Sequence, residues 1–348
     1  AVPLAAEEPS TVEGQPRRWN GFFQVREHFP LTTGYLVLEP VSGFTLPPGD
    51  WELEATLSQS NTFSASQVVE RELEARTTRA PFTREMFDEL AATDPFDQTF
   101  YLDAQVSRLA LRARRGLGDG WEVDVLLPLI GVHGGRTDVL VEGFHDLLGF
   151  DQEGREKVTR DHVQQLVSGQ GLEIDLGGSG LEPGDLVLGL KRRLAGDVST
   201  WAVLAELDLK LPTGASDALI SSGGADVGLS FVGSRCWKSR CGHAMVGYVF
   251  AGAADALPTE SQALFSTALA FEQAWSRGWG LTVQAQYWQS YLDDLGFEHF
   301  AEDTIQLGAT AGKATGWGRF YVGLSENSFS FKNSSDVTFH AGWKLVWE

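Results

Sequence analysis

Alternation of apolar and polar residues is the dominant pattern along the chain. From residue 51 to 58, every odd position is apolar and every even position is acidic or carries a hydroxyl group. The same period of two recurs in segments that include residues 109, 121, 186, 201, 227, 246, 269, 281, 305, 320 and 337. A period of two is typical of a β-strand with one apolar and one polar face. The pattern predicts about twelve strands and no dominant helical domain.

The length of these segments favours a membrane-spanning structure. They run for roughly 10 to 14 residues, whereas strands of ordinary globular proteins average about 5 to 6. A strand of about 10 residues, tilted by about 45°, crosses the apolar core of a bilayer. We therefore predict an all-β fold, a closed antiparallel transmembrane β-barrel over residues 49–348, preceded by an N-terminal periplasmic segment over residues 1–48.

The connections between the predicted strands differ on the two sides of the barrel. On one side they are short and rich in turn residues, and they cover residues 116–120, 195–199, 233–242, 276–278 and 314–316. On the other side they are longer and cover residues 61–95, 133–184, 212–224, 252–262, 293–303 and 327–335. Outer-membrane barrels have short periplasmic turns and long extracellular loops. An even number of strands then places both termini in the periplasm.

Apolar periodicity and a following glycine predict short helices in the second long loop, at residues 138–148 and 160–168.

The tryptophans support this orientation. Eight of the eleven fall at the end with short connections, with Trp237 inside one of the turns: Trp51, Trp121, Trp201, Trp237, Trp275, Trp279, Trp317 and Trp347. An indole ring is apolar but its N–H group prefers water, so tryptophan collects at membrane interfaces. The distribution predicts an aromatic girdle.

Composition and charge exclude several classes of protein. The 348 residues carry a net charge of −20, and 43% of them are hydrophobic. So large an acidic excess argues against a nucleic-acid partner, because phosphate groups are neutralised by clustered Lys and Arg. The apolar content argues against a disordered acidic chain. Most of the excess acid falls in the predicted long loops, where it could repel anionic solutes or bind divalent cations that bridge to lipopolysaccharide.

The N-terminal segment offers two further expectations. Its small residues before Glu7 resemble the end of a secretory signal peptide, which indicates export. Residues 10–48 hold several aromatic side chains without a strong period, and these disfavour free disorder. We expect either a hatch that enters the lumen or a strap across the periplasmic mouth.

The C-terminus resembles the insertion signal of bacterial outer-membrane barrels, which the barrel-assembly machinery reads. His340, Gly342, Leu345 and Trp347 occupy its polar, glycine, apolar and aromatic places. The sequence departs from that signal in one respect, because Glu348 follows the aromatic residue that usually comes last.

Two internal stretches carry a family resemblance. The pair Gly184–Lys191 and Leu207–Gly214 (GDLVLGLK, then LDLKLPTG) resembles outer-membrane barrels of the phenol meta-cleavage pathway. The stretch from Gly134 to Arg155 is similar to the long second loop of an uncharacterised bacterial outer-membrane family, a domain of unknown function. That resemblance covers about residues 15 to 348. It implies a barrel, and by analogy passage of a hydrophobic or aromatic compound.

The polar faces of the predicted strands supply candidate lumen-lining residues, with nearly balanced charge. These candidates are Arg108, Arg112, Arg114, Asp124, Lys191, Glu206, Asp208, Lys210, Asp226, Glu272, Arg319 and Lys344. One interpretation is a pore whose opposed charges filter solutes. The other is a network of salt bridges that fills a narrow lumen, since twelve strands leave little space.

The long loops supply weaker candidates: His133, His145, Asp146 and Arg155. A metal site from His133, His145, His162 and Asp146 lacks tight ligand spacing, and a helix-end pair of His145 and Asp146 is the plainer interpretation. A lipid-hydrolysing enzyme would need a serine beside a histidine at the outer rim, and His133 is the only well-placed base. No nucleophile motif accompanies it. We expect no enzyme activity, cofactor or metal.

Cys236 and Cys241 lie in a predicted periplasmic turn. The oxidising periplasm favours a small disulfide between them. A redox or metal-binding pair is the alternative.

The sequence thus predicts an outer-membrane barrel of a Gram-negative bacterium that serves as a passive channel for a small molecule. Its expected partners are that solute, outer-membrane lipid and lipopolysaccharide. A closed structural or lipid-interacting barrel is the first alternative, and a lipid-modifying enzyme is the second.

Overall fold

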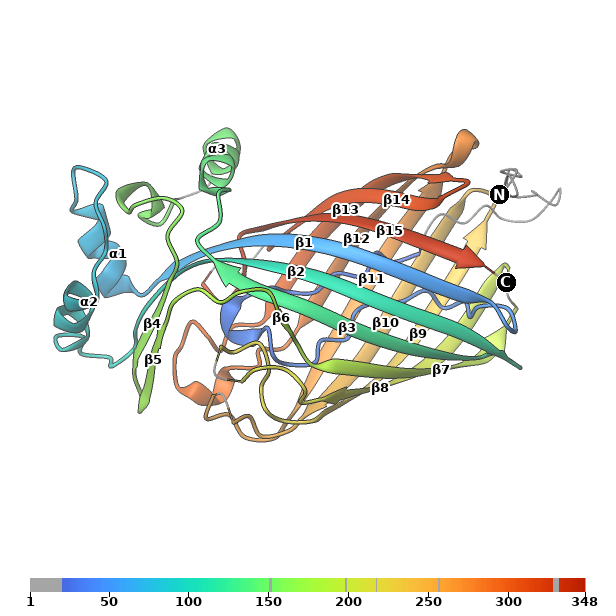
Figure 1. The fold of residues 1–348 in the computed structure, drawn as a ribbon, viewed down its shortest axis with the longest axis horizontal. Helices are drawn as coiled ribbons and strands as arrows, with labels where there is room; N and C mark the ends of the chain where they lie inside the picture. Colours follow the sequence, from blue (N-terminus) through green and yellow to red (C-terminus); the bar gives the residue numbers. More distant parts are fainter. Residues whose placement is uncertain are drawn as a thin grey trace.

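The computed structural model describes residues 21–347, apart from residues 150–151, 198, 217, 256 and 328–331. Fifteen strands are joined in one antiparallel sheet, and all but β4, β5 and β6 close into a ring of twelve (Figure 1). The ring strands are β1 (Trp51–Ala65), β2 (Thr99–Gly118), β3 (Trp121–His133), β7 (Leu186–Gly196), β8 (Trp201–Leu211), β9 (Asp226–Trp237), β10 (Arg240–Ala251), β11 (Gln262–Ala274), β12 (Trp279–Trp288), β13 (Thr304–Thr315), β14 (Gly318–Asn327) and β15 (Val337–Trp347). The predicted twelve-stranded barrel is confirmed.

The last strand closes the ring by pairing with the first. The β1–β15 ladder runs from Trp51 opposite Trp347 to Asn61 opposite Val337. The remaining neighbours in the ring pair in chain order, with β3 paired to β7 across the long second loop. Closure leaves the ring without a free edge, which a membrane-spanning sheet requires.

The two faces of the ring strands alternate as the sequence predicts. Leu57 and Leu269 point outward and are 52% and 62% exposed, whereas Ser58 points inward and is 2% exposed. An apolar outer face on a closed sheet suits contact with lipid. None of the helices in the described part of the chain has the length and apolar character needed to span a membrane.

One end of the barrel carries the long loops, and we call it the loop end. Three short helices lie there: α1 (Gln67–Glu74), α2 (Arg84–Ala91) and α3 (Asp138–Leu148). Helix α3 has the predicted bounds and ends at Gly149 in the left-handed conformation that glycine favours. Two 3₁₀ turns also lie in the long loops, η2 (Arg155–Lys157) and η4 (Asp293–Leu295). Of the other two, η1 (Pro30–Thr32) lies in the segment before β1 and η3 (Ser276–Gly278) in the short connection between β11 and β12.

The second predicted loop helix, at residues 160–168, is wrong. Residues Gln164–Gly169 form strand β4, which pairs with β5 (Leu172–Leu176), and the two-residue β6 (Glu182–Pro183) pairs with β3. The reason is the length of β2, whose first residues extend past the end of β3. Its free edge there is paired by β4, from Thr99 opposite Ser168 to Asp103 opposite Gln164. An available strand edge overrode local helical periodicity.

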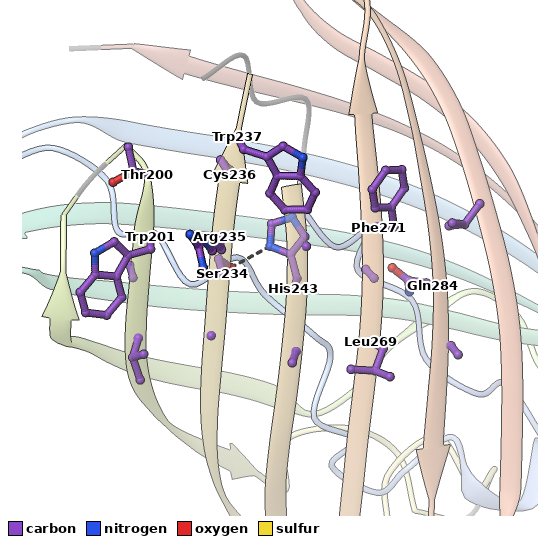
Figure 2. A pocket seen from close by; sticks show the side chains of 18 of the residues that line it. Thr200, Trp201, Ser234, Arg235, Cys236, Trp237, His243, Leu269, Phe271 and Gln284 are labelled. Carbon is purple, nitrogen blue, oxygen red and sulfur yellow. Dashed lines mark hydrogen bonds between the residues drawn. The ribbon is translucent and has the colours of Figure 1, made fainter. Parts of the chain in front are cut away.

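The other end of the barrel carries short turns and the tryptophan girdle, and we call it the turn end. All eight predicted girdle tryptophans lie there, and all but Trp51 are more than a third exposed. The turn predicted over residues 233–242 is shorter than expected. Only Lys238 and Ser239 separate β9 from β10, so Trp237 is the last residue of β9 (Figure 2).

The N-terminal segment occupies the inside of the barrel. Residues 21–46, which we call the plug, run through the lumen in mostly irregular conformation (Figure 1). Every residue from 21 to 41 is buried. The expected signal-peptide remnant and residues 1–20 lie outside the described residues. The hatch and strap interpretations concern residues 10–48. The described part of that range lies largely within the lumen, as a hatch would.

Candidate functional site

The plug is attached to the barrel wall through its backbone. Amide groups of Phe23, Leu36 and Gly43 donate to inward-facing side chains of two different strands: Gln284 on β12 (3.1 Å), Asp226 on β9 (2.9 Å) and Ser234 on β9 (2.8 Å). The Gly21 amide donates to Glu272 and the Leu46 amide to Glu122. Buried backbone amides outside regular structure need such partners. The inward polar residues therefore hold the plug.

One plug carboxylate is part of the charged wall. Glu39 accepts from Arg108 at 2.5 Å and from Arg112 at 3.0 Å, and all three side chains are at least nine-tenths buried. Sequence reasoning selected both arginines but missed Glu39, because the segment around it has no period. The signal available was the cluster of three inward cations on β2, which calls for a buried partner.

The turn-end half of the wall is a continuous network of ion pairs. Arg114 on β2 contacts Glu52 (2.5 Å) on β1 and Asp124 (3.0 Å) on β3. Lys191 on β7 contacts Asp124 (3.2 Å) and Glu206 (3.4 Å) on its two neighbouring strands. Lys344 on β15 contacts Glu52 and Glu54. Predicted lumen residues from six adjacent strands thus lie together and pair with one another.

A second ionic centre lies nearer the loop end. The Lys210 ammonium contacts Asp185 (3.0 Å) and Asp226 (3.1 Å), and it donates to the backbone carbonyl of Gly34 in the plug at 2.7 Å. Asp226 in turn holds the amide of Leu36. Lys210 and Asp226, which are paired across β8 and β9, therefore hold the same short stretch of the plug, at Gly34 and Leu36.

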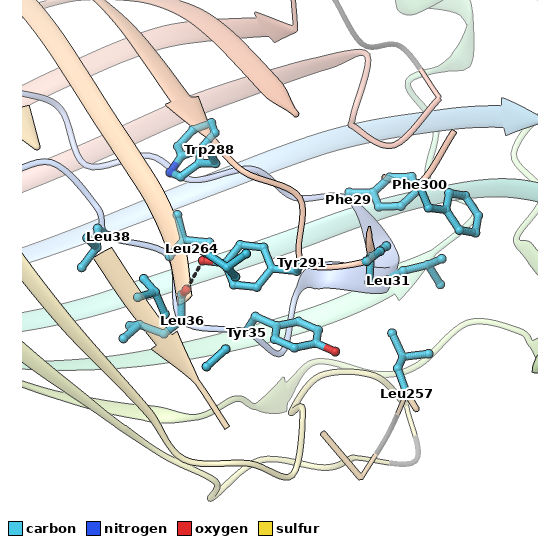
Figure 3. Close-up of a cluster of buried hydrophobic side chains, with 14 of the residues drawn as sticks. Phe29, Leu31, Tyr35, Leu36, Leu38, Leu257, Leu264, Trp288, Tyr291 and Phe300 are labelled. Carbon is cyan, nitrogen blue, oxygen red and sulfur yellow. Dashed lines mark hydrogen bonds between the residues drawn. The ribbon is translucent and has the colours of Figure 1, made fainter. Parts of the chain in front are cut away.

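The inner wall formed by β8–β12 carries a group of apolar side chains, beside polar ones such as Lys210, Asp226 and Gln284. Its inward side chains include Leu204, Val232, Met245, Val249, Leu264, Ala268 and Trp288, all buried. They pack against plug residues Phe29, Leu31, Leu36 and Leu38 (Figure 3). Tyr291, from the loop after β12, lies with its ring centre 5.1 Å from that of Tyr35 at a tilted angle, and its hydroxyl donates to the carbonyl of Leu36.

The lumen is therefore two-sided, and sequence reasoning attended only to its charged side. On these strands, apolar residues occupy some of the inward positions and polar residues occupy the others. The alternating pattern therefore did not reveal the apolar inward residues. A water-filled pore has a polar interior. In this barrel, by contrast, part of the lumen is formed by apolar side chains of the wall that pack against apolar side chains of the plug.

Two cavities remain beside the plug. One of about 220 Å³ lies at the turn end, between the plug and the side chains of Glu52, Arg114, Lys191 and Arg319. A smaller one of about 30 Å³ lies deeper, against Asp208 and Glu206. The predicted residues Arg319 and Asp208 thus face space between plug and wall, and Glu272 anchors the start of the described plug.

Arg155 is the centre of a buried contact at the loop end. Its guanidinium bonds Asn61 at the end of the β1–β15 ladder and Asp336 just before β15, and it lies 5.1 Å from the ring centre of Phe63. The long second loop is thereby fixed over the β1–β15 seam. The α1 and α2 helices pack nearby on β2 and β4, around Leu73, Phe87 and Leu166.

The remaining loop candidates do not gather into one site. His133 contacts Ser107 at 2.7 Å, while Asp146 accepts from Gln152 at 2.9 Å and His145 is buried at the loop end. Among the residues that the structure describes, no group of three or more His, Cys, Asp or Glu side chains is placed to hold a metal ion.

Glu142 on α3 joins two loops. It accepts from Arg79 of the first loop at 2.9 Å and from Arg160 of the second. Burial would raise the pKa of Glu142, but hydrogen bonds from Arg160 and Arg79 outweigh it and hold the pKa below its ordinary value of 4.5.

Cys236 and Cys241 form a disulfide, but they do not lie in a turn. They face each other across the β9–β10 ladder, because both strands run further than the sequence pattern indicates. The bond therefore crosses two paired strands near the turn end.

The predicted insertion signal lies in β15, on both of its faces. His340 points inward and contacts Ser58 and Ser325, both at 2.9 Å. The Tyr321 ring covers Gly342 so closely that a Cβ added there would lie 2.0 Å from it. Trp347 points outward and stacks on Trp51, with ring centres 6.4 Å apart.

Comparison with known proteins gives one family and one fold. A family model described as "Protein of unknown function (DUF3187)" matches residues 15–347. No curated protein matches the chain. The COG4313 outer membrane channel from Pseudomonas putida F1 matches with a TM-score of 0.56 and 14% identity, over 89% of this chain and 100% of that one.

Two weaker structural matches are the NanC porin and the CymD monoaromatic hydrocarbon channel. Their TM-scores are 0.42 and 0.35, each at 9% identity. The first covers 69% of this chain and 92% of the porin, and the second covers 86% of this chain and 88% of the channel. These two similarities are too distant to support a conclusion.

Proposed function

The chain belongs to the DUF3187 family, and from that premise we propose that it is a passive outer-membrane channel for a small hydrophobic molecule. In this proposal the turn end faces the periplasm and the loop end faces outside. The observation that carries the proposal is the group of apolar inward side chains on β8–β12, which packs against a plug that is not part of the sheet.

The two sides of the lumen suggest how solutes would be discriminated. Apolar contacts between Leu264 or Trp288 and the plug are non-directional, so an apolar solute can replace them at little cost. A hydrated ion or sugar would have to pass beside paired charges such as Glu39 and Arg108, whose separation is costly. Hydrophobic molecules therefore have the easier path. The similar fold of the Pseudomonas putida outer membrane channel supports a transport role.

Transport is tested with purified protein in liposomes. We expect the protein to accelerate entry of a small aromatic hydrocarbon such as toluene into vesicles that contain a trapped reporter, with no acceleration for glucose. Planar bilayers should show little steady ion conductance. Equal rates for toluene in protein-free and protein-containing vesicles would overturn the proposal.

A cross-link tests whether the plug has to move. A Cβ added at Gly43 would lie 3.0 Å from the Cβ of Ser234, so a small shift of the plug brings the pair into the range of about 3.5 to 4.5 Å that a disulfide needs. The pair Gly43→Cys and Ser234→Cys is made in a Cys236→Ser, Cys241→Ser background, so that it is the only pair. Oxidation should reduce toluene entry at least fivefold and a reductant should restore it. The background without the new pair is the matched control.

One observation favours a second candidate, a lipid hydrolase. The Ser107 hydroxyl lies 2.7 Å from the His133 ring on the outer face near the loop end, the pairing that such an enzyme needs. Against it, that hydroxyl also donates to Gln59 at 2.5 Å. Phospholipid hydrolysis by the parent protein that Ser107→Ala and His133→Ala each abolish would establish this candidate, and no hydrolysis by the parent excludes it.

A further inference from the structure

The outer face of the barrel has a hollow of about 1400 Å³ near the turn end, on β8–β12 (Figure 2). Its floor is a cross-strand row in which the small residues Gly233, Ala244 and Ala285 lie on the two sides of Leu269. A Cβ added at Gly233 would meet no atom within 4 Å. The floor residues have the outward parity of the exposed Leu269 and Leu307, so the hollow opens toward lipid.

Large side chains border the hollow toward the turn end and toward the barrel centre. Toward the turn end stand Trp201, Trp237 and Phe271, each more than 40% exposed (Figure 2). Toward the barrel centre the next row carries Phe231 and Val246, directly paired across β9 and β10. The hollow is therefore a local depression between rows of large side chains, and the outer face around it is not uniformly low.

A cation stands at the turn-end border. Arg235 lies opposite Trp201 on β8 and opposite Gly242 on β10, and its side chain is exposed. Within the described residues its guanidinium has no carboxylate partner. Asp197, in the nearest turn, is bonded to Ser199 and Thr200 of its own loop.

Other cations at this level are differently placed. Arg115, Arg192 and Lys313 each lie over a girdle tryptophan, at 5.0, 4.8 and 5.3 Å from the ring centres of Trp51, Trp121 and Trp279. Arg240 is bonded to Gln273 at 3.0 Å. Arg235 differs from these cations because it lies beside the hollow, next to Gly233 on the same face of β9.

We infer that this hollow is a binding site for one anionic glycerophospholipid. An acyl chain would lie over Gly233 and Ala244, where it covers apolar surface, and its phosphate would be held by Arg235 at the depth of the girdle. A guanidinium fork suits a phosphate group. The inference rests on the proposed outer-membrane placement, but it does not depend on transport.

Lipid retention measured by native mass spectrometry tests the site. The full-length barrel is delipidated in detergent and titrated with phosphatidylglycerol or phosphatidylcholine of the same chains. The wild type should bind one phosphatidylglycerol at least tenfold more tightly than phosphatidylcholine. Arg235→Gln should weaken phosphatidylglycerol about tenfold and remove the preference, because a charge-assisted bond is lost. Gly233→Leu should weaken both lipids.

Lys313→Gln is the matched control, since Lys313 borders another lipid-facing hollow but lies over Trp279. It should bind both lipids as the wild type does. Heat-modifiable mobility on gels shows that each variant is folded. The inference is overturned if Arg235→Gln binds like the wild type, or if Lys313→Gln weakens binding equally. It is also overturned if the protein is a dimer that Gly233→Leu dissociates, because a second copy of the chain would then occupy the hollow. Toluene entry, assayed separately, distinguishes failure of this site from failure of the channel.

Discussion

Glu39 shows how one residue links the plug to the wall. It lies between Arg108 and Arg112, and its removal would leave two buried guanidinium groups with less compensation. Breaking a buried ion pair on one side is more destabilising than the pair is stabilising. The plug is therefore not a passive filler of the lumen.

Glu39→Gln should lower the free energy of unfolding by about 3 kcal/mol, because a buried charge partner is lost. Urea unfolding of the barrel in lipid vesicles measures this change. Glu85→Gln, on the exposed surface of α2, is the control and should change stability by less than about 0.5 kcal/mol. A Glu39 variant as stable as the control would show that the arginines are satisfied elsewhere.

Gly342 gives a second residue-scale prediction. A methyl group there would collide with the ring of Tyr321, whose hydroxyl donates to Glu54 at 2.8 Å. Gly342→Ala should cost about 1 to 3 kcal/mol by overpacking. Gly233→Ala points into open space and should be nearly neutral. Equal stability of the two variants by urea unfolding would contradict this account.

At the scale of elements, the ring strands were predictable and the contents of the ring were not. Strands such as β8 and β15 alternate over most of their length, because lipid on one side and a lumen on the other impose a period of two. The plug and β4 have no such constraint. The plug is held by scattered partners such as Ser234 and Gln284, and β4 by an edge of β2 that a local pattern does not reveal.

The candidate site followed the same division. Charged wall residues such as Arg114 and Lys191 were identifiable because they share the parity of the polar face of their strands, which lies opposite the lipid-facing apolar positions. Glu39 and the apolar inward side chains of β8–β12 depend on which segment fills the lumen, and that is settled by packing between residues far apart in the chain.

The loop elements carry a pH-dependent contact. The pKa of Glu142 is held below 4.5, so its bonds to Arg79 and Arg160 contribute stability above pH 4.5 and are lost as pH falls through the lowered value. Limited proteolysis should therefore cut the loops faster below about pH 4, while the barrel stays intact. Glu142→Gln should lack this acid step, and an identical step in both proteins would assign it to other groups.

At the scale of the whole molecule, the net charge of −20 is unevenly distributed. The described lumen acids and bases largely pair with one another, and the acidic excess lies mostly in the loop-end segments. An ion that approaches from the loop end therefore meets a negative field that salt screens beyond about 10 Å at 0.1 M.

This field predicts cation selectivity for any residual ion leak. In a Glu39→Gln barrel, whose plug is weakened, reversal potentials in a KCl gradient should favour K⁺ over Cl⁻. The preference should fall as total salt rises toward 1 M, because the Debye length shortens to about 3 Å. An anion-selective leak would place the controlling charges in the arginine-rich part of the lumen instead.

The position of the plug before β1 also constrains the order of assembly. The wall is complete only when β15 reaches β1, at the seam where Trp347 stacks on Trp51. A plug that arrived later would have to thread Glu39 past wall residues already paired with one another, with its own charge uncompensated at a cost of several kcal/mol. Closing the wall around the plug avoids that barrier. The last seam to form thus seals the plug in place, and the plug acts as a template on which the charged strands converge.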